Sequence, residues 1–285
     1  MHIRTILTAA TFSIATVAFA AQGTFERTLT VGASPTVAVT TGSGNVRVRP
    51  GSDNQAHIIG HVHAGSMGWL SGSSPDSRIQ EIVNNPPIVQ NGNDITIGEH
   101  HNSDLFRNIS IDYDITLPKN SALSANSGSG DVDIQDVGSS LKAHSGSGNV
   151  RANGIPGPAT LGTGSGDIEF HQTAPGDVKA ETGSGNITLR GISGALKSST
   201  GSGNIEVEGQ PSADWRLSTG SGNIQLALGS GARFTLDADT GSGSINVQQP
   251  ITMQGSLNRH HVNGVVNGGG ATIRANTGSG DIQIR

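Results

Sequence analysis

Apolar and polar residues alternate along most of the chain in short runs, and each run leads into the triplet Gly-Ser-Gly. Asn or Asp follows the triplet (Ser once), then Val or Ile, then another apolar residue two positions later. Strict alternation sends successive side chains to opposite faces, as in a β-strand with one buried face. The pattern predicts a repeated unit of strand, tight corner and strand, of which residues 182–189 are a clear example.

This unit returns at a nearly fixed interval. From Gly128 to Gly241, successive triplets begin 18, 18, 19, 18, 19 and 21 residues apart. Self-similarity at such a period is typical of a solenoid, and a glycine inside every unit disfavours a helical repeat. The sequence therefore predicts an all-β fold, a single-stranded parallel β-helix (β-solenoid) with about 18–20 residues per coil.

The corners are the most regular feature of the chain, and we assign their residues a structural role. Glycine reaches positive φ values that other L-residues avoid, and Asn or Asp side chains hydrogen-bond the backbone of turns. Coils that stack about 4.8 Å apart would align equivalent side chains into ladders. The predicted turn motif consists of Gly128, Gly130, Asp131, Gly146, Gly148, Asn149, Gly164, Gly166, Asp167, Gly183, Gly185, Asn186, Gly201, Gly203, Asn204, Gly220, Gly222 and Asn223.

An interruption of the repeat near the N-terminal end suggests four parts. Residues 1–20 combine a positive start, an apolar run and Ala18-Phe19-Ala20, the pattern of a secretory signal peptide. Residues 21–63 are predicted to form N-terminal strands and the first coil, 64–107 an irregular insertion, and 108–285 the regular repeats. The insertion contains a predicted short helix at 75–83, followed by a hairpin that turns at 91–94.

The C-terminal end carries two further expectations. The triplets at Gly241 and Gly278 are 37 residues apart, so a degenerate coil is expected around 257–266, with Asn263-Gly264 and 268–270 as substitute turns. The last coil, ending at Ile284-Arg285, is expected to leave an open strand edge. Such an edge favours edge-to-edge self-association.

Composition limits the classes of partner. The net charge is −5, aromatic residues make up 3% of the chain, and no basic stripe with interleaved aromatics occurs, so nucleic acid is not an expected partner. The absence of cysteine means that no disulfide stabilises the fold. No segment after residue 20 is apolar over a length that would cross a bilayer, and the mature chain is expected to have no transmembrane segment.

The repeats resemble the bacterial "putative adhesin" family of unknown function, whose members are exported or membrane-attached. The similarity is carried by 115–119 leading into 127–132, and by 267–270 leading into 277–282, both of which end in Gly-Ser-Gly-Asp-[Val/Ile]. It covers roughly residues 30–285. The resemblance implies a β-solenoid and supplies no catalytic residues.

Three kinds of chemistry compete with the structural interpretation of the corners, and each is disfavoured by the sequence. Asp131 and Asp167, two coils apart at roughly 9.6 Å, approach the carboxylate spacing of inverting glycosidases, but their position recurs in every coil. The calcium-binding nonapeptide fails at Val132, where it requires Asp. No serine has the partners of a nucleophile.

Histidines are the remaining candidates. His57, His61 and His63 share one strand face, and the pairs at 100–101 and 260–261 lie in loop-like segments, without cysteines or carboxylates at ligand spacing. We therefore assign no metal, cofactor or catalytic residue. The outward positions form a mixed polar face: Lys142, His144, Lys179, Glu181, Lys197, Arg216, Asp237, Asp239 and Arg274.

These observations favour an exported, non-enzymatic interaction module of the cell envelope or surface, adhesin-like, with a glycan or a cell-surface protein as its partner. Periplasm, cell surface and secretion all fit the signal peptide. Two alternatives stay open: a β-helical polysaccharide lyase or hydrolase, and a structural scaffold that binds a protein partner through the insertion.

Overall fold

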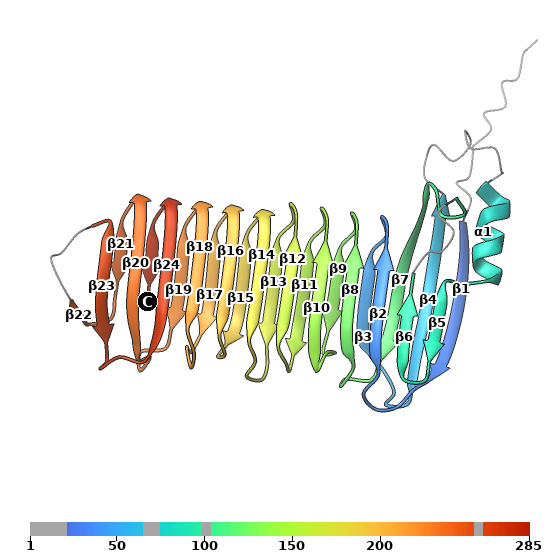
Figure 1. Cartoon of the computed structure of the whole chain (residues 1–285), viewed down its shortest axis with the longest axis horizontal. Coiled ribbons are helices and arrows are strands. Elements are labelled where there is room, and N and C mark those ends of the chain that lie inside the picture. Colours follow the sequence, from blue (N-terminus) through green and yellow to red (C-terminus); the bar gives the residue numbers. More distant parts are fainter. Residues whose placement is uncertain (1–21, 65–74, 99–103, 254–258) are drawn as a thin grey trace, which may run out of the picture.

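The chain forms an elongated β-solenoid in a computed structural model that describes residues 22–64, 75–98, 104–253 and 259–285 (Figure 1). Two long sheets face each other, and each regular coil contributes one strand to each sheet with a Gly-Ser-Gly corner between them. The predicted all-β solenoid with a short helix near its N-terminal end is confirmed. The signal-peptide prediction at 1–20 lies outside the described residues.

The strands are numbered along the chain but are stacked in a different order. Sheet A contains, in spatial order, β1 (Gln22–Thr30), β4 (Gln55–Ala64), β7 (Ile109–Leu117), β3 (Val46–Pro50), β9 (Val132–Gln135), β11 (Val150–Ile155), β13 (Ile168–Gln172), β15 (Ile187–Ile192), β17 (Ile205–Gly209), β19 (Ile224–Leu228), β25 (Ile282–Ile284) and β21 (Ile245–Val247). Sheet B contains β22 (Ile251–Met253), β23 (His261–Val266), β20 (Phe234–Ser242), β24 (Ala271–Ser279), β18 (Trp215–Ser221), β16 (Leu196–Ser202), β14 (Val178–Ser184), β12 (Ala159–Thr163), β10 (Ser140–Ser145), β8 (Ala122–Ser127), β2 (Thr36–Thr41), β6 (Asp94–Ile97) and β5 (Ile88–Asn91).

The core is a narrow apolar layer between the sheets. Within β15, Ile187 and Leu189 are fully buried, whereas Thr188 and Arg190 point outward, as the alternation predicts. Because neighbouring strands pair in register, equivalent residues stack into ladders along the axis. The residue after the Asn or Asp of each corner forms one such ladder, fully buried at Val132, Val150, Ile168, Ile187, Ile205, Ile224 and Ile282.

The N-terminal end is closed by elements that leave the parallel pattern. In sheet A, β4 pairs antiparallel with both β7 and β1, and in sheet B the β5–β6 hairpin continues the sheet beyond β2. The helix α1 (Pro75–Asn84) packs its buried Ile79 and Ile82 against β1 and β4. Gly23 makes room for it, because a Cβ there would lie 2.6 Å from the Ile79 side chain. Among the described residues, no helix has the length and apolarity that crossing a membrane requires.

At the C-terminal end, the stacking order differs from the expectation. β24 lies between β18 and β20, and β25 lies between β19 and β21, so the last coil is inserted into the stack (Figure 1). The predicted open edge at Ile284-Arg285 is therefore wrong, and β21 forms this end of sheet A.

The degenerate coil expected around 257–266 does not form in the part that the structure describes, although the turn expected at 268–270 does connect β23 to β24. β23 runs antiparallel to β20 and to β22, and Asn263-Gly264 lies inside β23 and makes no turn. Alternation defines which face of a strand is buried, but a parallel and an antiparallel strand bury the same residues. The pattern could not distinguish the two directions.

Engineered disulfides test the inserted last coil in a chain that has no native cysteine. Ser279 of β24 pairs in register with Ser221 of β18 on one side and with Ser242 of β20 on the other. All three serines are exposed. The double variant Ser221→Cys/Ser279→Cys should form a disulfide on mild oxidation, because paired Cα atoms about 4.8 Å apart suit the bond. Ser221→Cys/Ser242→Cys should not, because two strand spacings, about 9.6 Å, separate that pair. Mass spectrometry after alkylation reads the result, and the reverse pattern would refute the stacking order.

Candidate functional site

The Gly-Ser-Gly corners form a continuous ridge along one edge of the solenoid, and the predicted turn motif lies on it. In each corner the hydroxyl before the triplet is buried and donates a hydrogen bond to the preceding coil in the stack. Thr163 Oγ1, for example, donates to Gly148 O at 2.8 Å and accepts from Gly166 N at 3.1 Å. The same donation to the neighbouring coil, at 2.8–3.0 Å, is made by Thr41, Ser127, Ser145, Thr182, Thr200, Thr219, Thr240 and Thr277.

A second ladder is formed by the Asn and Asp side chains that follow the triplets, with Asp112 of β7 at one end and the backbone N–H of Ser244 at the other. Each Oδ1 accepts the backbone N–H of the equivalent residue one coil along, as Asp131 does from Asn149 at 2.8 Å. The series follows the spatial order of the coils: Asp112, Asn45, Asp131, Asn149, Asp167, Asn186, Asn204, Asn223, Asp281 and Ser244, with bonds of 2.6–3.0 Å. Asp131 and Asp167, the candidate acid pair, are members of this ladder.

The glycines of the motif are required mainly by the close approach of stacked backbones. A Cβ on Gly166 would lie 2.2 Å from Gly148 O, and the other motif glycines meet the corner of the next coil in the same way. A positive φ occurs within the motif only at Gly203 and Gly222, at 150° and 151°. The expectation that positive φ explains the corner glycines is thus wrong for most of them.

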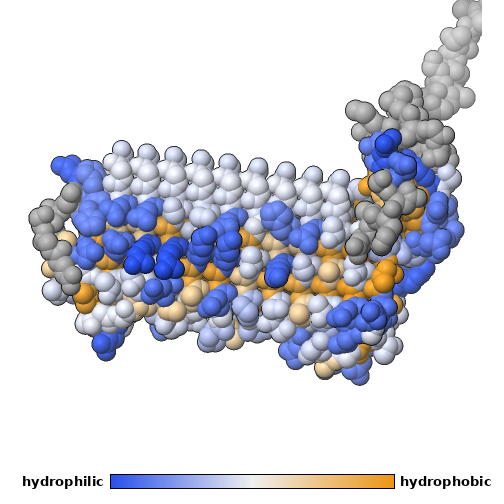
Figure 2. All heavy atoms as spheres, viewed as in Figure 1, coloured by the Kyte–Doolittle hydropathy of each residue, from blue (hydrophilic) through white to orange (hydrophobic). Residues whose placement is uncertain are grey.

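A groove of about 550 Å³ runs across the strands on the outer face of sheet B, from β2 to β18. Figure 2 shows an apolar stripe along the long axis of this face, bordered by hydrophilic side chains. The groove is open because many of the outward residues along both of its sides are small. They are Ala38, Ala122, Ser124, Ser140, Pro158, Thr160 and Ala195.

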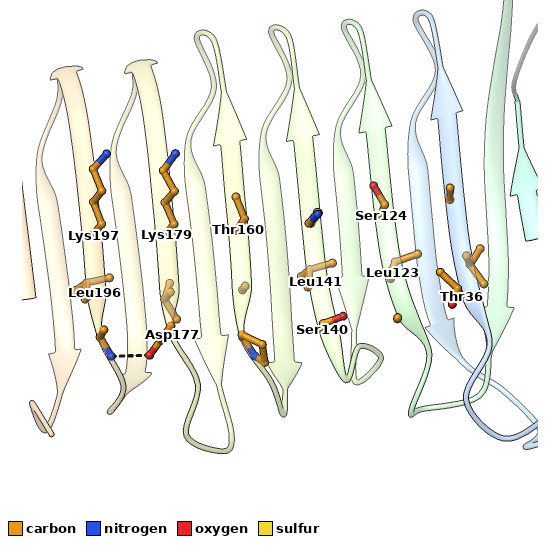
Figure 3. Close-up of a pocket in the computed structure, with 18 of the residues that line it drawn as sticks. Thr36, Leu123, Ser124, Ser140, Leu141, Thr160, Asp177, Lys179, Leu196 and Lys197 are labelled. Atoms are coloured by element: carbon orange, nitrogen blue, oxygen red, sulfur yellow. Dashed lines mark hydrogen bonds between the residues drawn. The ribbon is translucent and has the colours of Figure 1, made fainter. Parts of the chain in front are cut away.

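Basic side chains form one wall of this groove. Strand pairing places Lys142, Thr160, Lys179, Lys197, Arg216 and Arg274 at equivalent positions of consecutive strands, so that five cations share one row. We call these five residues the cationic row. In Figure 3, Lys179 and Lys197 extend side by side in the same direction, and Asp177 lies toward the other end of its strand, across the groove.

The charges of the row are only partly compensated. Glu181 accepts from Lys179 and Lys197 at 2.7 and 2.9 Å, and these hydrogen bonds hold the pKa of its carboxyl below the usual range. Arg274 lies 3.7 Å from Asp237. Lys142 and Arg216 form no ion pair with any residue that the structure describes. An anionic ligand would therefore meet uncompensated positive charge in this row.

The histidines are brought next to carboxylates that the sequence did not associate with them. On the outer face of β4, His57 lies 2.7 Å from Glu26, and His61 and His63 each lie 3.3 Å from a carboxylate of β7. Asp237 and Asp239 of β20 meet His261 of β23, with candidate ligand atoms within 4.8 Å of one another. Sequence reasoning missed this group because the antiparallel pairing of β20 with β23 was not foreseen. The pair at 100–101 lies outside the described residues.

Fold and site together define a repeat protein with an extended, charged surface. Residues 70–285 match the Toastrack family, DUF4097, and the chain belongs to this family. No curated protein matches the chain.

Two solved structures are similar to the chain at low identity. A "putative adhesin" from Bacteroides fragilis NCTC 9343 is 15% identical with a TM-score of 0.46, covering 92% of this chain and 97% of its own. A "putative cell adhesion protein" from Clostridium sporogenes ATCC 15579 is 13% identical with a TM-score of 0.28, covering 92% and 99%. At these scores neither likeness assigns a ligand or an activity.

Substituting a corner glycine tests the close-approach argument. Gly166→Ala should lower the free energy of unfolding by roughly 2–4 kcal/mol, because its Cβ would overlap a backbone carbonyl that cannot move independently. Gly231→Ala is the control, since nothing lies within 4 Å of a Cβ there. It should leave stability unchanged or raise it by up to ~1 kcal/mol. Equal losses in urea titrations would contradict the assigned role of the corner glycines.

The Asn/Asp ladder is tested by removing one acceptor. Asn186→Ala deletes the oxygen that accepts Asn204 N at 3.0 Å, and we expect a loss of about 1 kcal/mol in unfolding free energy. Asn153→Ala serves as control, because that exposed side chain makes no hydrogen bond to the described residues. Chemical denaturation of both variants provides the comparison. If Asn186→Ala and Asn153→Ala unfolded at the same denaturant concentration, the ladder would have no effect on stability.

Proposed function

We propose that the protein is an exported, non-enzymatic interaction module of the cell envelope or surface, adhesin-like, which holds an extended partner along the outer face of sheet B. The groove from β2 to β18 is the observation that carries this proposal. It crosses coil after coil at equivalent positions, so a partner with its own linear repeat can make the same contact many times. Many weak contacts of this kind add up to strong overall binding.

The sequence supports the exported location and the adhesive role. Residues 1–20 have the pattern of a signal peptide, and the repeats resemble those of an adhesin-named family. The groove is shallow and open along its length, which suits a polymer better than a small molecule enclosed in a deep cavity. A glycan fits this geometry without an exposed strand edge, which an added peptide strand would need.

The main alternative, a polysaccharide-cleaving enzyme, receives less support from the described residues. The candidate acids Asp131 and Asp167 are bound into the corner ladder, each with its Oδ1 accepting a backbone N–H. The insertion proposed as a site for catalysis contributes α1 and the β5–β6 hairpin to the N-terminal end. These elements close the stack there (Figure 1), and none of their residues lines the groove, although β6 pairs with β2 at its N-terminal end.

A glycan array with the mature protein (residues 21–285) tests the proposal, with soluble sugar products monitored in parallel. We expect saturable retention on a subset of neutral or acidic glycans without product release. Envelope fractions from bacterial cells serve as a second panel for protein partners. Product release would contradict the non-enzymatic role, and absence of binding on both panels would contradict the interaction module.

A further inference from the structure

Building on the proposed function, we infer that the groove on sheet B binds a linear acidic polysaccharide, whose anionic groups lie along the cationic row. The row from Lys142 on β10 to Arg216 on β18 spans four strand spacings, about 19 Å. A small anion would occupy one coil, whereas a polymer with regularly spaced acidic groups meets a cation on almost every coil. The length of the row therefore selects a polymer.

The charge balance along the row selects a negatively charged polymer. Four cations line the groove from Lys142 to Arg216. The carboxylate of Glu181 pairs with Lys179 and Lys197, and those of Asp177 and Asp214 lie on the opposite side, so the groove keeps a net positive charge. The two ends of this segment, Lys142 and Arg216, have no ion-pair partner among the described residues. Both side chains are exposed, so they reach a ligand without disturbing the core.

The opposite wall of the groove accepts hydrogen bonds and suits the hydroxyl groups of sugars. Asp177 and Asp214 lie there, and each uses Oδ1 to accept a backbone N–H of the next coil in the stack, from Ala195 at 3.1 Å and from Thr272 at 3.0 Å. Their second carboxylate oxygens make no hydrogen bond to described residues and can accept from a ligand hydroxyl. One wall thus binds anions and the other binds hydroxyls, as an acidic sugar chain requires.

Other polyanions fit this groove less well. No aromatic side chain is among the residues that line it, and base stacking on aromatic side chains is the usual basis of single-strand nucleic-acid binding. An acidic peptide that binds as an added strand would need an exposed strand edge, whereas the strands beneath the groove are paired on both sides from β2 to β18. A chain of acidic sugars needs neither feature.

Binding of polygalacturonate oligosaccharides to the mature protein tests this inference, with the methyl-esterified form of the same oligosaccharides as the neutral control. Titration calorimetry at several salt concentrations should show binding of the acid form, weakening as salt rises, and at least about tenfold weaker binding of the ester. A sulfated glycan of similar length distinguishes sulfate from carboxylate as the preferred anion. Single-stranded DNA and poly-glutamate are the competing polyanions.

Three variants locate the contact. Lys142→Gln/Arg216→Gln should weaken binding at least about tenfold and reduce the salt dependence. Glu181→Gln should strengthen binding by about two- to fivefold, because it frees Lys179 and Lys197. Arg190→Gln, an exposed cation on the outer face of sheet A, is the matched control and should change nothing. All substituted side chains are outward, so thermal unfolding should match the parent protein.

The outcomes separate this inference from the proposed function. Equal binding of acid and ester forms, or no response to the groove variants, would overturn the acidic-polysaccharide assignment while leaving an interaction module intact. Displacement by DNA or poly-glutamate at the same concentrations would also overturn it, in favour of a general polyanion surface. Retention of neutral glycans or envelope proteins alone would overturn the inference, and no retention of any kind would overturn the proposed function itself.

Discussion

The contact distance between stacked corners is the constraint on which the rest of the structure depends. A solenoid with one Gly-Ser-Gly corner per coil brings backbone carbonyls so close to the next coil that a Cβ would lie 2.0–2.5 Å from a carbonyl oxygen at the motif glycines. The buried hydroxyl and the Asn or Asp beside each triplet then fasten coil to coil. In-register pairing of both sheets follows from this contact, and the apolar ladders and the cationic row follow from the register.

Much of this arrangement could be predicted from the sequence, because a period-two pattern and a period of about 19 residues are both local or repetitive signals. Ile187 and Leu189 are inward and Lys179 and Lys197 outward, as their parity requires. Helix α1 and the β5–β6 hairpin have their own start, stop and turn signals, and both occur.

The order of strands was not predictable, because it depends on which compatible faces meet. Ile273, Ala275 and Thr277 fit against β18 as well as against β20, and the structure places them between the two. The groups that combine distant residues share this limit. His261 reaches Asp239 only because β23 runs antiparallel, and Arg274 extends the cationic row only because β24 lies against β18. The sequence predicted that the corners need glycine. In most corners, however, the reason is close contact between stacked coils and not a positive φ.

The inserted last coil has a consequence for how the chain reaches its native state. Synthesis proceeds from the N-terminus, so residues 234–247 emerge before residues 271–285, yet they occupy the more distal place in the stack. If residues 234–247 paired directly with β18 and β19, they would occupy the positions that β24 and β25 take in the native stack. Assembly of this end must therefore wait for residues 271–285, and a variant without them would keep a gap between β18 and β20.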